Sequence, residues 1–506
     1  MALWNALTLG ATGTMQPKNI LFIGTDQQRL STLNCYGHDF AVSPNIDRLA
    51  LEGVRFTDAY TASPVCSPSR TSTLLGVHVP IHGIYENGIS PHDHIASLTS
   101  WFDVIKGQGY STAMIGKTHF DPVPSTIDHL DVHTGNADKR GSQIAASEFL
   151  ETYLVNQTME WITNVSTTNG SASASASAPS VSKPWGVYMS FVSPHPPNWV
   201  PKGPWSEAYE GVTLPPINYR EGNIGELPYQ TRMLLGLLGK EHDDPPAFPM
   251  GVPNMSYIDQ SFDAGAAVQT GRLAYYTQAA YVDHEVGRIL DFLDTMKLRH
   301  STLVIFASDH GSELWDHGIG NDKHTFLDAA LRVPLILRLP GILPPNATRR
   351  FASLLDVTAT IIAASGIAPH KGPADHQGFD LIAPIAAGGL SPRRAVVSCE
   401  YRAMALITPT WKLSYFPEQG DGQLFDRRTD WAEQIDLYNK TSMRATRDGL
   451  LIALLRWRAQ QDALGYMQAH SKGAGPTATL AFNHTESIRG IDAEVRLQED
   501  ALQYEP

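Results

Sequence analysis

The amino-acid sequence predicts an α/β fold: a large domain with a mainly parallel, mixed sheet flanked by helices, and a small C-terminal subdomain with an antiparallel sheet. Short apolar runs of strand length recur far apart in the chain, and amphipathic helical patterns lie between them. Such runs fit strands buried on both faces, and strands that alternate with helices favour a parallel sheet. From about residue 391 the pattern changes to strand-like alternation, which favours the small antiparallel sheet.

The expected elements of the large domain follow from these runs. Three apolar runs are the expected core strands: Asn19–Gly24, Trp185–Val192 and Thr302–Ala307. Two segments carry apolar residues at helical spacing and are expected helices: Ile46–Gly53, which stops at glycine, and the long Ala274–Met296. Residues 194–253 are rich in proline and glycine, so we expect loops and short helices over the sheet edge there.

The length of 506 residues exceeds one minimal domain, at roughly 100–200 residues per domain. We expect an N-terminal extension over residues 1–17, the large domain over residues 18–385, and a C-terminal subdomain and tail over residues 386–506. Residues 166–183 include the low-complexity run SASASASAPSVS, which predicts a flexible surface insertion. In the C-terminal part, Leu450–Gln460 is an expected helix that starts just after Gly449.

Composition excludes several classes of function. The net charge of −13 argues against a general nucleic-acid binder, whose affinity depends on neutralising phosphates. A small anionic substrate is still compatible, because a pocket can be locally basic. No apolar stretch reaches the length of a membrane-spanning helix, so we expect no membrane partner. Three cysteines do not make a disulfide framework. The sequence leaves the oligomeric state open.

The sequence gives two opposing indications of the cellular compartment. The first 14 residues lack the cationic start and strong apolar run of a signal peptide, so we expect a cytoplasmic protein. Secretion is the alternative, because the chain carries seven N-glycosylation sequons, at Asn156, Asn164, Asn169, Asn254, Asn346, Asn439 and Asn483.

The segment Ser63–Gly76, SPVCSPSRTSTLLG, is the most informative one for chemistry. Cys66 stands at the Ser/Thr-rich start of a helical pattern, where peptide N–H groups favour an anion or a developing negative charge. Arg70, four residues on, can reach back over one turn. An isolated cysteine is more often a small buried hydrophobe, so the whole string has to be weighed.

This string resembles the signature of the type I sulfatases, a family with an alkaline phosphatase-like fold. Residues 66–70 fit C-x-P-x-R, and TSTLLG continues the longer signature. The resemblance implies that a formylglycine-generating enzyme converts Cys66 to formylglycine, whose hydrated aldehyde is the nucleophile. It spans about residues 18–440, with the family elements in order, and the large domain is then the catalytic domain.

The resemblance also implies a metal site. NILFIGTDQQR contributes Asp26, and Gln27 stands where the family usually has a second acid, as in the branch that reads DQ. ASDHG contributes Asp309 and His310, and residue 66 completes the set. Carboxylate oxygens suit Ca²⁺, the usual ion of the family, or Mg²⁺, and the histidine favours Mn²⁺. Without the family pattern, Asp26 could equally cap a helix and Asp309 could lie in a turn.

The remaining family positions imply a catalytic set. Arg70 would orient the hydrate, the lysines would neutralise oxygen charge, one histidine would take a proton from the hydrate, and another would protonate the leaving oxygen. Asn87, in HGIYENG, stands where choline sulfatases and phosphonate monoester hydrolases have an active-site asparagine. The other residues of this set are Lys117 and His119 in GKTHF, His195 in FVSPHPP, and Lys323 in NDKHTF. Asn87, Lys117, His195 and Lys323 would also bind the substrate. Cys35 and Cys399 match nothing and are interpreted as structural.

Three functions compete. The first is hydrolysis of a small anionic sulfate ester through formylglycine and a divalent metal. The second is hydrolysis of phosphonate monoesters or phosphodiesters at the same site, and the third is a catalytically inactive binding protein. The alcohol part of the substrate is not readable. A quaternary ammonium would need an aromatic cage, and the candidates are Trp185, Trp199, Trp205 and Trp315.

Overall fold

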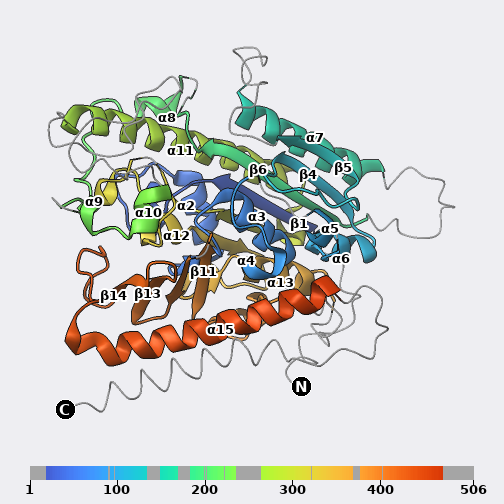
Figure 1. Ribbon diagram of the computed structural model, residues 1–506. Coiled ribbons are helices and arrows are strands. Elements are labelled where there is room, and N and C mark those ends of the chain that lie inside the picture. Colours follow the sequence, from blue (N-terminus) through green and yellow to red (C-terminus); the bar gives the residue numbers. More distant parts are fainter. Residues whose placement is uncertain are drawn as a thin grey trace.

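An eight-stranded sheet lies at the centre of the computed structural model (Figure 1). The structure describes residues 19–88, 92–95, 97–133, 149–168, 183–198, 200, 202–220, 223–234, 264–320, 322–367, 376–401 and 403–470. The strand order is β5-β4-β6-β1-β7-β8-β2-β9. The strands are β1 (Asn19–Asp26), β2 (Val54–Phe56), β4 (Ser111–Lys117), β5 (His129–His133), β6 (Trp185–Pro194), β7 (Thr302–Ser308), β8 (Leu335–Arg338) and β9 (Ala347–Arg349). A separate pair consists of β3 (Ala59–Tyr60) and β10 (Ala352–Ser353).

The sheet is mixed but mainly parallel, as predicted. Strands β5, β4, β6, β1 and β7 are parallel neighbours, β8 runs antiparallel to both β7 and β2, and β9 is parallel to β2. The three predicted core strands are the three central ones, β6, β1 and β7. All eight residues of β1 are buried, because helices cover both faces of the sheet.

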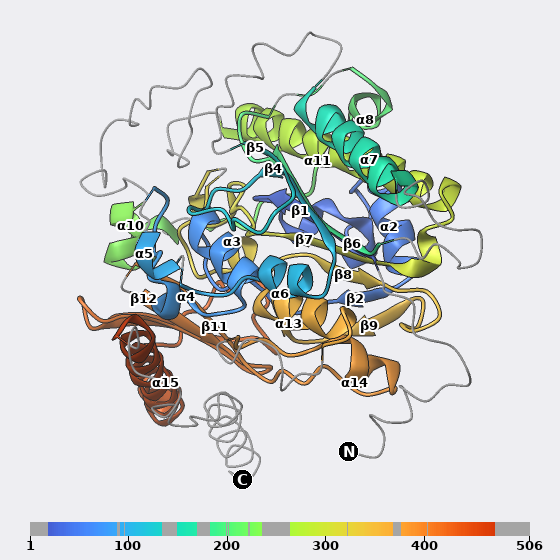
Figure 2. The same ribbon diagram turned by 90° about the vertical axis from the view of Figure 1, so that its right-hand side faces the viewer.

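The two faces are covered by different helices, which Figure 2 shows above and below the sheet. Leu21 and Ile23 of β1 pack with α2 (Pro44–Leu51), α7 (Leu150–Thr168) and α11 (Ala264–Thr295). Ile20 and Phe22, which point the other way, pack with α3 (Cys66–Leu75), α6 (Trp101–Gly107) and α13 (Leu355–Ala364). This alternation of contacts explains why β1 reads as a continuous apolar run.

A small antiparallel sheet follows near the C-terminus, as predicted. Its order is β11-β12-β13-β14, and its strands are β11 (Val396–Glu400), β12 (Ala403–Ile407), β13 (Trp411–Phe416) and β14 (Asp421–Asp426). Its first two strands are buried on both faces. Val397 and Leu406 pack toward α15 (Arg444–His470), whereas Val396 and Ala405 pack against the large domain. The domain boundary near residue 385 stays a prediction.

Two long helices begin well before their predicted starts. Helix α15 begins at Arg444 and runs through Gly449 instead of starting after it. A helix-interior glycine costs about 1 kcal/mol, and packing of α15 on α4, β12 and β13 outweighs that cost. Helix α11 begins at Ala264, ten residues before the predicted start at Ala274.

Short helices and 3-10 turns lie in the segments that connect the longer elements. Residues 194–253 contain short helices in their described parts, as predicted. Residues 1–17, residues 235–253 and most of the Ser/Ala insertion lie outside the described residues. No described helix has the length and hydropathy to cross a membrane. The short helices are α4 (Val79–His82), α5 (His92–Ile95), α8 (Pro204–Glu207), α9 (Asn223–Glu226), α10 (Tyr229–Leu234), α12 (Asp328–Leu331) and α14 (Ile382–Ala386), with 3-10 turns at Leu30–Thr32, Asn34–Tyr36, Arg299–Ser301, Asp316–Gly318 and Thr441–Met443.

Candidate active site

The predicted site residues converge at the carboxyl ends of four neighbouring strands. Asp26 is the last residue of β1, Lys117 is the last of β4, and Asp309 directly follows β7. His195 directly follows β6, which lies between β4 and β1. Parallel strands bring their carboxyl ends to one edge, where the ligands of α/β proteins bind. Cys66 reaches the same place as the first residue of α3.

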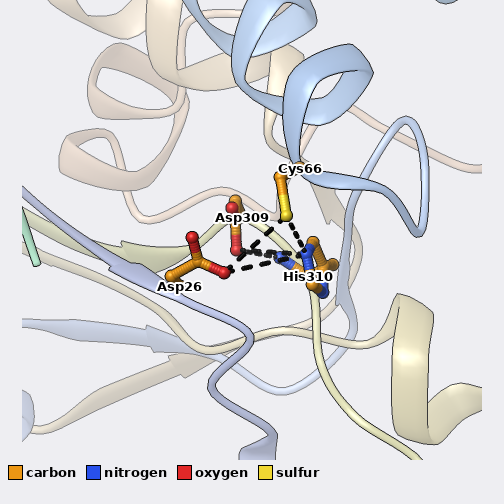
Figure 3. Close-up of side chains that lie close together, drawn as sticks. All are labelled: Asp26, Cys66, Asp309 and His310. Carbon is orange, nitrogen blue, oxygen red and sulfur yellow. Dashed lines mark hydrogen bonds and ion pairs between the residues drawn. The ribbon is translucent and has the colours of Figure 1, made fainter. Parts of the chain in front are cut away.

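Cys66 is fully buried, and its thiol lies among polar side chains (Figure 3). Its Sγ lies 3.0 Å from His310 Nε2, 3.5 Å from Lys323 Nζ and 3.8 Å from Asp26 Oδ1. Burial raises the pKa of the thiol, but the positive charges of Lys117, Lys323 and His310, together with a hydrogen bond to His119, hold this pKa well below its usual value. These are the surroundings typical of a reactive cysteine.

Four side chains form a cluster with the composition of a metal site. One potential ligand atom from each of Asp26, Cys66, Asp309 and His310 lies within 4.8 Å of all the others. Burial and the negative charge of Asp26 raise the pKa of Asp309, although Arg70 opposes them. A bound divalent cation would relieve the electrostatic repulsion between these two crowded carboxylates. The donor set therefore fits a hard or borderline ion.

Arg70 holds the two carboxylates in place. Its Nε donates to Asp309 Oδ2 at 2.7 Å, and its Nη2 donates to Asp26 Oδ2 at 3.2 Å. The other oxygen of each carboxylate, Oδ1, lies near His310 Nε2. The distance is 4.0 Å for Asp26 and 3.8 Å for Asp309. Lys117 also pairs with Asp26 Oδ2. Although burial and Cys66 raise the pKa of Asp26, Lys117, His195 and Arg70 bring it down to about 2.

Gln27 connects the cluster to Lys323. It adopts a left-handed backbone conformation, with φ of 60°. Its N–H donates to Asp309 Oδ1 at 2.9 Å, and its Oε1 accepts from Lys323 Nζ at 2.9 Å. Its side chain thus lies beside the cluster, and a ligand role for it stays a prediction.

Lys323 and His195 form a hydrogen-bonded pair. Lys323 Nζ lies 3.1 Å from His195 Nε2, and His195 Nδ1 lies 2.7 Å from the carbonyl oxygen of Pro196. The carbonyl can only accept, so Nδ1 carries the ring proton and Nε2 accepts from Lys323. Burial, and then the charge of Lys323, lower the pKa of His195 to about 3. Burial lowers the pKa of Lys323, but the negative charges of Cys66 and of three nearby aspartates together raise it above its usual value.

The remaining two predicted residues differ in their surroundings. His119, with φ of 52°, makes a hydrogen bond that helps to lower the pKa of the Cys66 thiol. Asn87 Oδ1 accepts the backbone N–H of Ser67 at 2.9 Å, at the start of α3. This contact holds the helix that carries Cys66, and a role of Asn87 in substrate binding stays a prediction.

A family model described as Sulfatase matches residues 18–367, more than half of the chain. This chain belongs to the sulfatase family. A choline-sulfatase from Rhizobium meliloti (strain 1021) is 27% identical over 456 residues, which are 83% of this chain and 82% of that protein. The sulfatase is therefore a sulfuric ester hydrolase.

Two solved structures share the fold of this sulfatase. The phosphonate monoester hydrolase of Agrobacterium radiobacter has a TM-score of 0.70 and 22% identity, covering 88% of this chain and 96% of that chain. A protein in complex with its substrate D-glucosamine-2-N,6-O-disulfate has a TM-score of 0.70 and 20% identity, covering 88% of this chain and 98% of that chain.

Several residues that support the site were not identified from the sequence. Tyr188 and Ser190 of β6 accept hydrogen bonds from Arg70 Nη1, at 2.9 and 2.7 Å. Two hydroxyls, two residues apart in an apolar strand, were a readable signal because they share a face. The Tyr275 hydroxyl accepts the Arg29 N–H at 2.9 Å and donates to the Gln27 carbonyl. No local pattern points to Tyr275, which lies on α11.

A buried acid in the segment that follows His310 is not part of this set. Glu313 is fully buried, and its Oε1 accepts from the Thr325 hydroxyl. Its Oε2 has no hydrogen-bond partner among the residues that the structure describes. Burial, reinforced by the charge of Asp316, raises the pKa of Glu313 to about 8.

This pKa predicts how Glu313→Gln changes stability. The folded state favours the protonated acid, so the contribution of Glu313 is complete below about pH 4.5 and is lost as the pH rises through about 8. Glutamine keeps an acceptor for Thr325 and never ionises. The variant should therefore melt above the wild type at pH 9, with a smaller difference at pH 5, as measured by calorimetry. Glu207→Gln, on the surface of α8, is the control, and a difference that shrinks as the pH rises would contradict the prediction.

Proposed function

We propose that this sulfatase hydrolyses small anionic sulfate monoesters through a formylglycine made from Cys66, with a divalent cation held by Asp26, Asp309 and His310. The observation that carries the proposal is the position of Cys66. Its Sγ lies within 4 Å of a candidate metal ligand on one side and of a lysine on the other. A nucleophile, a cation site and a proton source thus surround one point.

Conversion of residue 66 fits its surroundings. A hydrated formylglycine supplies a hydroxyl as nucleophile and a second hydroxyl through which the sulfate can later be expelled. The buried position of Cys66 and its place at the start of α3 give the attacking oxygen a fixed direction. His119, already hydrogen-bonded to the thiol, is the residue that we assign to take the proton of the second hydroxyl.

The cations of the site divide into two groups. Arg70 and Lys117 contact the carboxylates, and we assign them to keep Asp26 and Asp309 ionised and oriented. Arg70 donates to both carboxylates, to the Lys117 carbonyl and to two hydroxyls of β6, so we assign it to the carboxylates first and to the hydrate second. Lys323 contacts the neutral Gln27 and His195, so its charge is directed at the sulfate oxygens.

The leaving oxygen takes its proton from the Lys323–His195 pair. In the free site His195 Nε2 accepts from Lys323, so the pair has one mobile proton between the two nitrogens. A bound anionic ester offsets the charge of Lys323, which is a main cause of the low pKa of His195. His195 can then hold that proton at Nε2 and donate it to the departing alkoxide.

The cation would act as a Lewis acid on the reacting oxygens. Ca²⁺ is the ion that we propose first, and Mn²⁺ and Mg²⁺ are the alternatives, because His310 adds a nitrogen to an oxygen-rich set. The formylglycine-generating enzyme is the protein partner that this mechanism requires.

The first prediction of this mechanism separates sulfatase from phosphonate hydrolase activity. The wild-type enzyme, with residue 66 converted, should hydrolyse nitrophenyl sulfate faster than nitrophenyl phenylphosphonate, and peptide mapping should find formylglycine at position 66. Cys66→Ala should lose at least about 10³-fold in turnover, because the covalent step is gone, while the fold survives. Cys399→Ala, which removes a buried thiol in the core between the small sheet and α15, should keep its activity. A faster phosphonate reaction would favour the alternative function.

A second prediction concerns the cation. Asp309→Asn should weaken binding of Ca²⁺ or Mn²⁺ by more than the roughly 10–100-fold that loss of an outer partner costs, as measured by calorimetric titration of metal-stripped enzyme. Asp283→Asn is the control, because Asp283 is equally buried but caps α2 through the N–H groups of Asn45 and Ile46. Equal affinity in the wild type and Asp309→Asn would refute the proposed ligand set.

A third prediction concerns His195. An acidic phenol departs as a stable anion, whereas a sugar or alkyl alkoxide needs a proton in the transition state. His195→Ala should lower turnover of an alkyl sulfate by about 10²–10⁴-fold and that of nitrophenyl sulfate much less. The measurement is the slope of log kcat against the pKa of the leaving group, which should steepen in the variant. If turnover of both substrates fell by the same factor, His195 would not be the proton donor, and we would assign that role to Lys323 alone.

A further inference from the structure

The small C-terminal sheet touches the active-site loop at one charged contact. Glu400, the last residue of β11, is 3% exposed, and its Oε1 pairs with Nδ1 of His324. His324 directly follows Lys323 in the chain. The pair therefore joins the sheet to the residue next to the catalytic lysine.

The backbone at this point needs an external restraint. His324 has φ of 73°, a left-handed conformation that is unfavourable for a non-glycine residue. On the other side of Lys323, the Lys323 N–H donates to Asp322 Oδ1 at 2.8 Å. The Glu400–His324 pair and this hydrogen bond thus fix both ends of the peptide segment from which the Lys323 side chain projects. Burial lowers the pKa of His324, but the charge and hydrogen bond of Glu400, together with the charge of Asp322, raise this pKa above its usual value, so the imidazole is charged more readily in the pair.

Other ionic contacts join the sheet to the large domain without reaching Lys323. Lys412 of β13 pairs with Asp328 on α12, and Arg427 after β14 pairs with Asp58 at 2.8 Å. These contacts hold the sheet in place, whereas Glu400 contacts a residue adjacent to the site. The difference allows attachment of the sheet and positioning of the lysine to be tested separately.

We infer that Glu400 is a positioning residue of the active site, which acts through His324 to aim Lys323 Nζ at the substrate. The C-terminal sheet thereby completes a site whose other side chains come from the large domain. This inference deepens the proposed function and rests on the role of Lys323 in it. It assigns no chemical step to Glu400 itself.

The test uses Glu400→Gln in the full-length enzyme, which keeps the size of the side chain and removes its charge. We expect kcat for an alkyl sulfate to fall by about 10-fold or more, in line with the loss of an outer-shell partner. KM should change little, and the dependence of kcat on leaving-group pKa should steepen. In a Lys323→Ala background, Glu400→Gln should add no further loss. Asp58→Asn, which breaks the Arg427 contact, should lower Tm with kcat unchanged.

A crystal structure of Glu400→Gln decides the positioning independently of the substrate. Lys323 Nζ should leave its 2.9 Å contact with Gln27 and its 3.1 Å contact with His195. The inference would be overturned if Lys323 did not move in the Glu400→Gln structure. It would also be overturned if the losses of kcat caused by Glu400→Gln and Lys323→Ala were additive. A wild type without sulfate hydrolysis would instead refute the proposed function and leave this structural test decisive. If Glu400→Gln does not fold, His324→Asn replaces it, because asparagine tolerates the left-handed backbone but cannot reach Glu400.

Discussion

The active site depends on one electrostatic constraint: two carboxylates, Asp26 and Asp309, must stay ionised side by side inside the protein. Burying unpaired charges costs far more than a fold can supply, so cations must accompany them. Arg70 meets this need because its planar guanidinium donates to both carboxylates at once, through Nη2 at 3.2 Å and Nε at 2.7 Å. Since Arg70 lies one turn after Cys66 on α3, the same contact brings the start of that helix over the ends of β1 and β7. Charge compensation and placement of the nucleophile are thus one interaction.

The same constraint explains how an acidic protein can hold an anionic ester. The chain has a net charge of −13, yet three cations lie buried at this point. Arg70 and Lys117 are matched by the carboxylates. Lys323 contacts neutral groups and the Cys66 thiol. Under the proposed conversion of Cys66, the thiol would become an uncharged aldehyde. The partner that raises the pKa of Lys323 most would then be lost, and the anionic substrate could take its place. The proposed modification would thus give the site affinity for an anion as well as a nucleophile.

Sequence reasoning reached the parts of the molecule that local patterns encode. The central strands were readable because helices on both faces make them uniformly apolar, and Cys66, Asp26 and Asp309 were found because they stand at fixed places beside such elements. Tyr275 and Glu400 were not found, because each acts through a contact with a residue more than 70 positions away and has no local signature. Helix α15 was started too late because Gly449 looked like a boundary, whereas packing on the small sheet decided its length. The sequence therefore predicted most of the groups nearest the thiol, but not the residues that hold those groups in place through tertiary contacts.

That support changes how the C-terminal sheet should be regarded. A sheet that only covered the large domain would need apolar contacts, and β11 and β12 have them on both faces. The interface also contains buried ion pairs, which contribute less net stability than apolar contacts of similar size but fix the relative position of their partners. Two charged contacts of the sheet, Glu400 with His324 and Lys412 with Asp328, fall on the segment directly after Lys323. A lysine with four rotatable bonds donates a proton effectively only if its backbone is held. The large domain holds this segment through Asp322 before His324 and through the Thr325–Glu313 contact after it, and the Glu400–His324 pair adds a contact from the C-terminal sheet. On the inference that Glu400 positions Lys323, this contact accounts for a polar group at a place that packing alone would fill with an apolar side chain.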